Sequence, residues 1–153
     1  MVEAKHKQSG RKVTARGALA GTQLLGIESR RTRELVGQVQ AGFPFSYLVH
    51  LEQQSGLSRQ QLAQFAAIPP RTLARRQRAG QLAPEESDRL LRFARIFESL
   101  IDLFEGDKDH ARRWLLTPSV ALGKTPPLEF MSTEVGAREV EQLIGRLEHG
   151  VFT

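Results

Sequence analysis

Five arginines lie within two short segments, residues 58–67 and 70–79, and their spacing is suited to binding nucleic acid. If residues 70–79 form a helix, three of its polar side chains share one face and two further arginines flank that face. An arginine guanidinium donates hydrogen bonds to a guanine edge or to a phosphate, and the sequence leaves both options open. The predicted DNA-binding residues are Arg59, Gln60, Arg71, Thr72, Arg75, Arg76 and Arg78.

The alternative interpretation is that these arginines only form a solvated basic surface. Solvated helices usually carry both signs of charge, but acids are absent between residues 59 and 84. This imbalance favours a nucleic-acid partner. Arg76 and Arg78 are expected to contact phosphates, whereas Arg59 and Gln60 are expected to reach the DNA backbone beside the groove.

Local chain geometry predicts a helix-turn-helix at the same two segments. Ser58 and Gln61 have the spacing of a capping box, which starts a helix. Pro69 disfavours helical geometry at the residue before it, and Pro70 suits the first turn of a new helix. Two short helices with a tight turn have the dimensions of a helix-turn-helix, although residues 66–67 are alanines where glycine is common.

The rest of the chain from Glu34 onward also has helical patterns, so the predicted fold class is all-α. The alternation of apolar and polar residues that marks strands is not sustained anywhere, and β-branched residues are sparse. Apolar residues at three- and four-residue spacing mark the longest helix. The expected helices cover residues 34–40, 45–54, 58–67, 70–79, 84–105, 107–116 and 133–150, with a short turn at 128–131.

Length and composition bound the possible classes of protein. The chain has 153 residues, 40% of them hydrophobic, which allows one ordinary domain or two small ones. It has no cysteine, which excludes disulfides, thiolate metal sites and cysteine nucleophiles. We find no apolar run that approaches 18 residues and no secretory signal, so we expect a cytoplasmic protein without a membrane span.

The net charge of +5 is unevenly distributed. Residues 59–95 hold eight arginines against three acids, whereas residues 96–153 hold six basic residues against ten acids. This asymmetry suggests two different partners on two surfaces. Residues 1–33 are strongly basic, and the first 30 or so are expected to be poorly ordered, as a solvated tail or as an arm that contacts phosphate or a partner.

The sequence offers little support for an enzyme. The four histidines (His6, His50, His110 and His149) lack the paired spacing of metal ligands. We find no phosphate-binding loop, dinucleotide-binding glycine pattern or nucleophile elbow. We therefore expect a binding protein that has no catalytic residues, no metal and no cofactor.

Several short motifs in a fixed order resemble those of Xre-like antitoxins that partner RES-domain toxins. The resemblance spans roughly residues 42–151, and its C-terminal part is similar to the Xre/MbcA/ParS toxin-binding domain. The motifs that carry it are Ile68 to Arg76, Gly80 to Leu82, Glu86 to Leu90, Ala111 to Leu116, Ala121 to Gly123, Thr125 to Leu128, Thr133 to Ala137 and Arg146 to Gly150.

This resemblance implies a function. Members of the family neutralise a toxin that resembles ADP-ribosyltransferases and consumes NAD⁺, and they repress their own operon through the helix-turn-helix. They usually form homodimers. We expect an arm at residues 1–33, a helical domain at 34–106 that contains the helix-turn-helix, and a helical toxin-binding domain at 107–153. The partners would be a RES-domain toxin and double-stranded operator DNA.

The last helix and the tail are expected to block the active site of the toxin. The predicted toxin-binding residues are Thr133, Gly136, Val140, Leu143, Arg146, Glu148, Gly150 and Val151. The apolar members of this set could equally be ordinary core residues, and the two glycines could serve close packing and helix capping. Two other functions stay open: a stand-alone helix-turn-helix regulator with a dimerisation domain, and an RNA-binding or structural adaptor.

Overall fold

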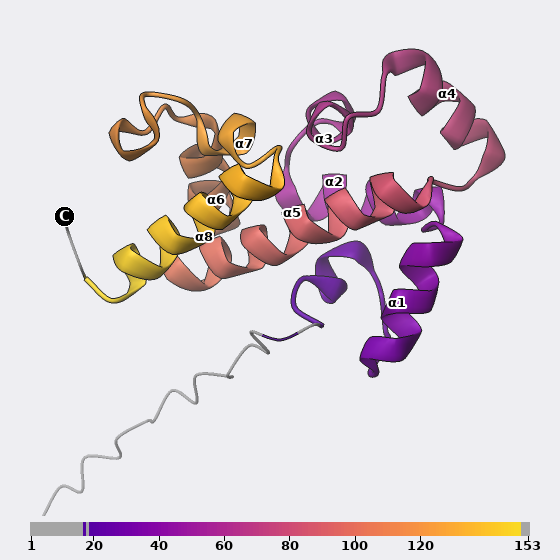
Figure 1. Ribbon diagram of the computed structural model, residues 1–153, viewed down its shortest axis with the longest axis horizontal. Coiled ribbons are helices and arrows are strands. Elements are labelled where there is room, and N and C mark those ends of the chain that lie inside the picture. Colours follow the sequence, from indigo (N-terminus) through magenta and orange to yellow (C-terminus); the bar gives the residue numbers. More distant parts are fainter. Residues whose placement is uncertain (1–16, 18, 151–153) are drawn as a thin grey trace, which may run out of the picture.

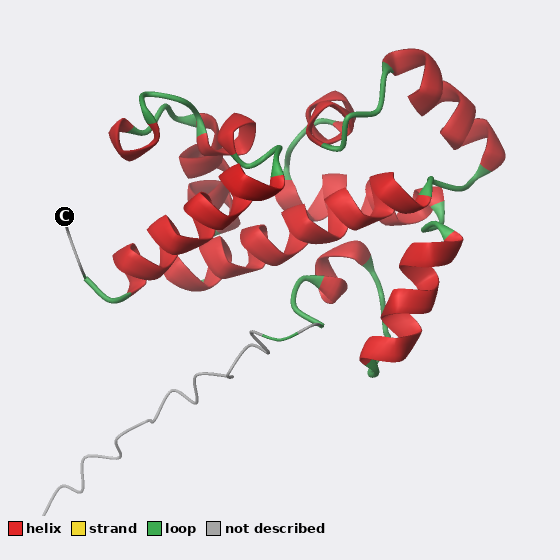
Figure 2. Cartoon of the chain, in the orientation of Figure 1, coloured by secondary structure: helices red, strands yellow, loops and turns green. Residues whose placement is uncertain are grey.

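The computed structural model of the protein describes residues 17 and 19–150. Within them the chain is all-α, with eight α-helices, two short 3-10 helices and no strand beyond two isolated bridges (Figures 1 and 2). The elements are η1 (Thr22–Leu25), α1 (Thr32–Ala41), α2 (Phe45–Ser55), α3 (Arg59–Phe65), α4 (Pro70–Ala79), α5 (Pro84–Leu103), α6 (Lys108–Leu116), η2 (Val120–Leu122), α7 (Pro127–Phe130) and α8 (Glu134–Glu148).

The twenty-residue helix α5 lies at the centre of the fold, and elements from both halves of the chain pack on it. Figure 1 shows α5 running through the middle of the molecule, with η1 and α1 on one side and α8 alongside its C-terminal part. Phe93 and Phe97 are fully buried, and their rings stack at 5.6 Å. Phe65 of α3 meets Phe93 edge-on at 5.5 Å, so the helix-turn-helix shares this core.

Three of the predicted helix starts are confirmed by side-chain caps, whereas α1 begins at Thr32, two residues before the predicted start. The Ser58 hydroxyl accepts a hydrogen bond from the Gln61 amide at 3.1 Å, and Gln61 Oε1 accepts one from the Ser58 amide at 2.9 Å. Asp107 caps α6, and Thr133 caps α8. Each cap satisfies a backbone donor that the helix itself leaves unpaired.

The expectation that the first 30 or so residues are poorly ordered is wrong for residues 19–27, which include η1 and pack on the core. Leu24, Leu25 and Ile27 are buried. Gly21 has a φ of +82° and lies very close to α5. A Cβ at this position would come within 2.5 Å of the backbone nitrogen of Arg95. A single 3-10 turn is too short to show a periodic pattern, so the helical period does not identify its apolar residues as buried. Residues 1–16 lie outside the described part of the chain.

Candidate functional site

The helix-turn-helix is formed by α3 and α4 and the four residues between them. In this turn, Ala67 has a φ of +57°, the left-handed conformation that glycine adopts more easily. Ile68 is buried, and its amide donates to the Ala63 carbonyl oxygen at 2.8 Å, which closes the C-terminal end of α3. Pro70 then begins α4, as expected for a proline in the first helical turn.

Three arginines form an exposed stripe along α4. Arg71, Arg75 and Arg78 are spaced by four and three residues, so they lie on one side of the helix. All three are exposed, and none forms an ion pair within residues 17 and 19–150. Unpaired guanidinium groups on a helix that could enter the major groove are suited to phosphates and guanine edges. We call these three residues the arginine stripe.

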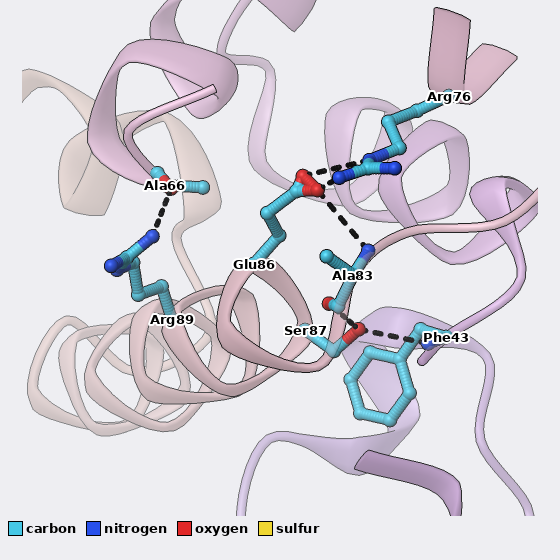
Figure 3. A network of polar contacts seen from close by, with 7 residues as sticks. All are labelled: Phe43, Ala66, Arg76, Ala83, Glu86, Ser87 and Arg89. Atoms are coloured by element: carbon cyan, nitrogen blue, oxygen red, sulfur yellow. Dashed lines mark hydrogen bonds and ion pairs between the residues drawn. The ribbon is translucent and has the colours of Figure 1, made fainter. Parts of the chain in front are cut away.

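Arg76 points in another direction from the stripe. Its Nε atom donates to Glu86 Oε1 at 2.7 Å and to Oε2 at 3.3 Å (Figure 3). Glu86 is only 5% exposed, so this ion pair is formed largely out of water. The sequence expectation that Arg76 contacts phosphate did not include this partner, because the acid follows ten residues later, in the next helix.

The other three predicted DNA-binding residues differ in how accessible they are to DNA. Arg59 donates from Nε to Glu52 Oε2 at 2.9 Å, and its guanidinium carbon lies 5.5 Å from the centre of the Phe45 ring. Gln60 is exposed near the start of α3, and Thr72 is half-buried. Among the seven predicted residues, Gln60 and the arginine stripe are therefore the most accessible.

The C-terminal candidates separate into buried and exposed residues. Val140 is fully buried and Leu143 is 8% exposed, so both pack against the core rather than face solvent. Gly136 is also buried, and a Cβ at this position would overlap the Phe130 carbonyl oxygen. These three residues position α8 against its neighbours in the free chain.

The remaining candidates lie at the two ends of α8. Thr133 is exposed and accepts a hydrogen bond from the Gly136 amide at 3.0 Å. Arg146 is half-buried and lies 3.9 Å from Glu139 Oε1. Glu148 and Gly150 are exposed, and Val151 lies outside the described residues.

Two exposed valines in this half of the chain were missed by the sequence analysis. Val135 is 80% exposed in the first turn of α8, and Val120 is 85% exposed in η2. For Val135 a clue was present, because it directly precedes the buried pair of residues 136–137 and so belongs to the outward side of the helix. Apolar side chains exposed to this degree are available to a protein partner.

Neither a metal site nor a membrane span was found in the described residues. No group of three or more His, Asp or Glu side chains there is arranged to hold a metal ion. The helices in the described ranges are also too short or too polar to cross a lipid bilayer.

Comparison with known families divides the chain between two matches. A model of the antitoxin Xre-like helix-turn-helix domain matches residues 34–95. A model of the antitoxin Xre/MbcA/ParS C-terminal toxin-binding domain matches residues 99–150.

Individual relatives cover most of the chain. A protein named Antitoxin Xre from Yersinia enterocolitica is 38% identical over 130 residues, which are 84% of this chain and 88% of the relative. An Antitoxin Xre from Photorhabdus laumondii is 34% identical over the same shares. A third, from Pseudomonas putida, is 30% identical over 76% of this chain and 72% of the relative.

Proposed function

The chain belongs to the family of Xre antitoxins, and we propose that it neutralises a cognate RES-type toxin and represses its own operon. Members of this family are binding and regulatory proteins, so the chain is not an enzyme. The observation that carries the DNA-binding half of the proposal is the arginine stripe, which is exposed and unpaired in the described part of the chain.

In the proposed DNA complex, α4 enters the major groove of the operator. The N-terminal half of such a helix meets base edges, so Arg71 and Thr72 would contribute most to sequence preference. Arg75 and Arg78 would add base or phosphate contacts along the same groove, and Gln60 would reach the backbone from the start of α3. A homodimer would place two copies of α4 on a palindromic operator, one helical turn of DNA apart.

The toxin half of the proposal rests on the C-terminal domain. The resemblance to antitoxins that partner RES toxins indicates an enzyme that consumes NAD⁺. The proposed contacts lie at the ends of α8: the exposed Thr133, Val135, Glu148 and Gly150, and the half-buried Arg146. A helix end placed in the NAD⁺ cleft would exclude the dinucleotide, and its charges would pair with groups that otherwise hold the substrate.

The two activities occupy separate parts of the chain in this proposal. Residues 34–106 would form the DNA-binding domain and residues 107–153 the toxin-binding domain, with residues 1–33 as an N-terminal extension. Figure 1 shows α4 near one end of α5 and the C-terminal end of α8 near the other. This separation supports the proposal because DNA and toxin could then bind one chain at the same time.

Co-expression with the neighbouring gene product tests the proposal. We expect the neighbouring gene product alone to lower cellular NAD⁺ and to stop growth. Co-expression of the present chain should restore the NAD⁺ level and growth, and the two proteins should co-purify. The purified chain should also retard a duplex from its own promoter. If it retards this duplex but forms no complex with an adjacent product, it is a stand-alone regulator, and the antitoxin proposal is wrong.

A further inference from the structure

We propose that Arg76 and Glu86 are positioning residues that set the orientation of α4 for DNA binding, and that Arg76 itself does not contact DNA. This inference rests on the proposed function, because it concerns how the arginine stripe is presented to a duplex. It reassigns Arg76, which the sequence pattern groups with the other arginines of the helix.

The first argument is that α4 has few other attachments along its length. None of its ten residues is buried, although the structure describes them all. On the side toward α3, residues of both helices line a groove of about 810 Å³. The lining of this groove includes Ala63 and Ile68 on one side and Leu73 and Gln77 on the other. The apolar packing of α4 on the core comes from the partly buried Leu73, and this single contact constrains the angle of the helix only weakly.

The second argument is that the two ends of α4 are held by other parts of the chain: the N-terminal end follows the turn at buried Ile68, and backbone pairing secures the C-terminal end. The Phe45 amide donates to the Gly80 carbonyl oxygen at 2.9 Å, and the Leu82 amide donates to the Phe43 carbonyl oxygen at 2.8 Å. These bonds begin after the last turn of the helix. One turn earlier, the Arg76–Glu86 pair ties the helix itself to α5, and this contact sets how α4 is rotated between its two ends.

The third argument is that Glu86 is itself held firmly. Its Oε1 also accepts a hydrogen bond from the Ala83 amide at 3.1 Å, which caps α5. The neighbouring Ser87 is fully buried, accepts from the Phe43 amide at 2.8 Å and donates to the Ala83 carbonyl oxygen at 2.8 Å (Figure 3). A carboxylate placed on such a rigid turn is a fixed reference for Arg76.

The same helix also fixes the end of α3. Arg89, one turn beyond Glu86, donates from Nη1 to the Ala66 carbonyl oxygen at 3.0 Å (Figure 3). Both helices of the helix-turn-helix are thus held by side chains from the first two turns of α5. The relative positions of α3 and α4 follow from this shared support.

Helical geometry separates Arg76 from the DNA-facing side. At 3.6 residues per turn, Arg76 points roughly 130° away from the centre of the arginine stripe. When Arg71, Arg75 and Arg78 face a groove of DNA, Arg76 faces α5. Its side chain is 28% exposed, compared with 7% for Glu86, so the pair is directed inward.

The decisive variant removes the acid rather than the arginine. If Arg76 bound phosphate, Glu86→Gln would free a positive charge and remove a negative one, so DNA binding would tighten. If the pair only orients α4, the same variant weakens operator binding. Gln retains one oxygen that can accept from the Ala83 amide, so the cap of α5 is preserved, but it loses the negative charge and the second oxygen that hold the Arg76 guanidinium. Glu85→Gln, at the exposed neighbouring acid, is the matched control for the change in charge.

Binding of Glu86→Gln, Arg76→Ala, Arg75→Ala and the control is measured against a promoter duplex and a scrambled duplex over a range of salt. We expect Glu86→Gln and Arg76→Ala each to weaken promoter binding about tenfold, with an unchanged salt slope and unchanged binding to the scrambled duplex. The double variant, Glu86→Gln combined with Arg76→Ala, should bind the promoter no more weakly than either single variant, because each single variant already loses the same ion pair. Arg75→Ala should instead reduce the slope by about one.

Two results would overturn the inference alone: tighter or unchanged promoter binding by Glu86→Gln, or a salt slope that falls by about one in Arg76→Ala. Thermal unfolding shows whether each variant is folded. If Glu86→Gln does not fold, the salt slope of Arg76→Ala decides the question. Arg76→Ala is expected to fold, because it removes a partly exposed side chain. Failure of the wild type to bind any duplex would instead overturn the proposed DNA-binding function, and this inference with it.

Discussion

Ala67 occupies the position in the helix-turn-helix turn where glycine is common, and it adopts the left-handed backbone conformation found there. An L-residue with a side chain pays roughly 1–2 kcal/mol for this conformation. Glycine avoids that cost but loses about 0.5–1 kcal/mol through the greater freedom of the unfolded chain. With alanine at position 67, the free energy of unfolding is therefore expected to be slightly lower than with glycine.

We expect Ala67→Gly to raise the free energy of unfolding by about 0.5–1 kcal/mol, measured by urea denaturation. Ala66→Gly is the matched control, because Ala66 is buried with a φ of −77° and gains nothing from glycine. That variant should be destabilised by about 1 kcal/mol. Equal destabilisation of both variants would contradict the strain assigned to Ala67.

The arginine stripe permits a test that separates the two proposed activities. Arg71→Ala combined with Arg75→Ala should weaken promoter binding by about tenfold or more and lower the salt slope by about one, the contribution expected of a phosphate contact at Arg75. Toxin neutralisation should be unchanged, because both side chains are exposed and contribute nothing to the core. Electrophoretic mobility shifts and a growth assay measure the two effects.

A control for net charge is available in the other half of the chain. Arg113→Ala combined with Arg138→Ala removes two exposed arginines from α6 and α8. If this pair weakens DNA binding as much as the stripe variant, the effect comes from overall charge rather than from α4. Loss of both activities in the stripe variant would instead indicate misfolding.

Among the elements, η1 is held on α5 through an acid in an unfavourable environment. The Gly21 amide donates to Glu98 Oε2 at 2.7 Å. Burial raises the pKa of the Glu98 carboxyl above its usual value of 4.5; the Gly21 hydrogen bond opposes this rise, and Asp102 adds to it. The folded state therefore binds this proton more tightly than the unfolded state, and its stability falls as the pH rises from about 4.5 through the raised pKa.

Glu98→Gln should remove this loss. We expect the variant to become more stable relative to the wild type as the pH rises from 4.5 to 7, because Gln can still accept from the Gly21 amide but carries no charge. Glu134, whose pKa is lowered by the Arg138 hydrogen bond and by Arg92, acts in the opposite direction in both proteins and cancels in the difference. Urea denaturation at each pH measures the effect, with Glu85→Gln as the control. A difference that does not vary with pH would contradict this assignment.

The helices that the sequence predicts are those that local chemistry determines. Ser58, Asp107 and Thr133 each cap a helix in the structure, because a cap needs only a side-chain oxygen and an amide three residues away. By contrast, η1 depends on the close approach of Gly21 to α5, a contact between residues far apart in the chain. No pattern within η1 itself could have predicted this packing.

In the candidate site, too, the sequence predicted what depends on local spacing but not what depends on tertiary packing. The arginines of α4 were identified from residue type and spacing, but the inward direction of Arg76 depends on where α5 places Glu86. In α8, spacing alone could not decide whether Val140 and Leu143 face a partner or the core, and the structure buries both. Helical period indicates which residues share a face, whereas tertiary packing decides what that face contacts.

At the scale of the whole molecule, the distribution of charge supports two independent partners. The stripe lies on α4 near one end of α5, and the C-terminal end of α8 lies near the other (Figure 1). Residues 96–153 carry more acids than bases, which disfavours DNA and suits a partner with basic groups. A change at the C-terminal end should therefore affect toxin binding without affecting the promoter complex.

Deletion of Gly150 to Thr153 tests this separation. A longer deletion from Arg146 would also remove Leu147, which packs against the core, so loss of function could then reflect loss of stability. The shorter deletion leaves α8 complete to Glu148. We expect it to release toxin activity in cells, seen as a fall in NAD⁺, while thermal unfolding and promoter binding stay unchanged. If protection persists, the inhibitory contact lies elsewhere, and the exposed Val135 in the first turn of α8 becomes the next position to change, as Val135→Asp, with the exposed Val36→Asp of α1 as its control.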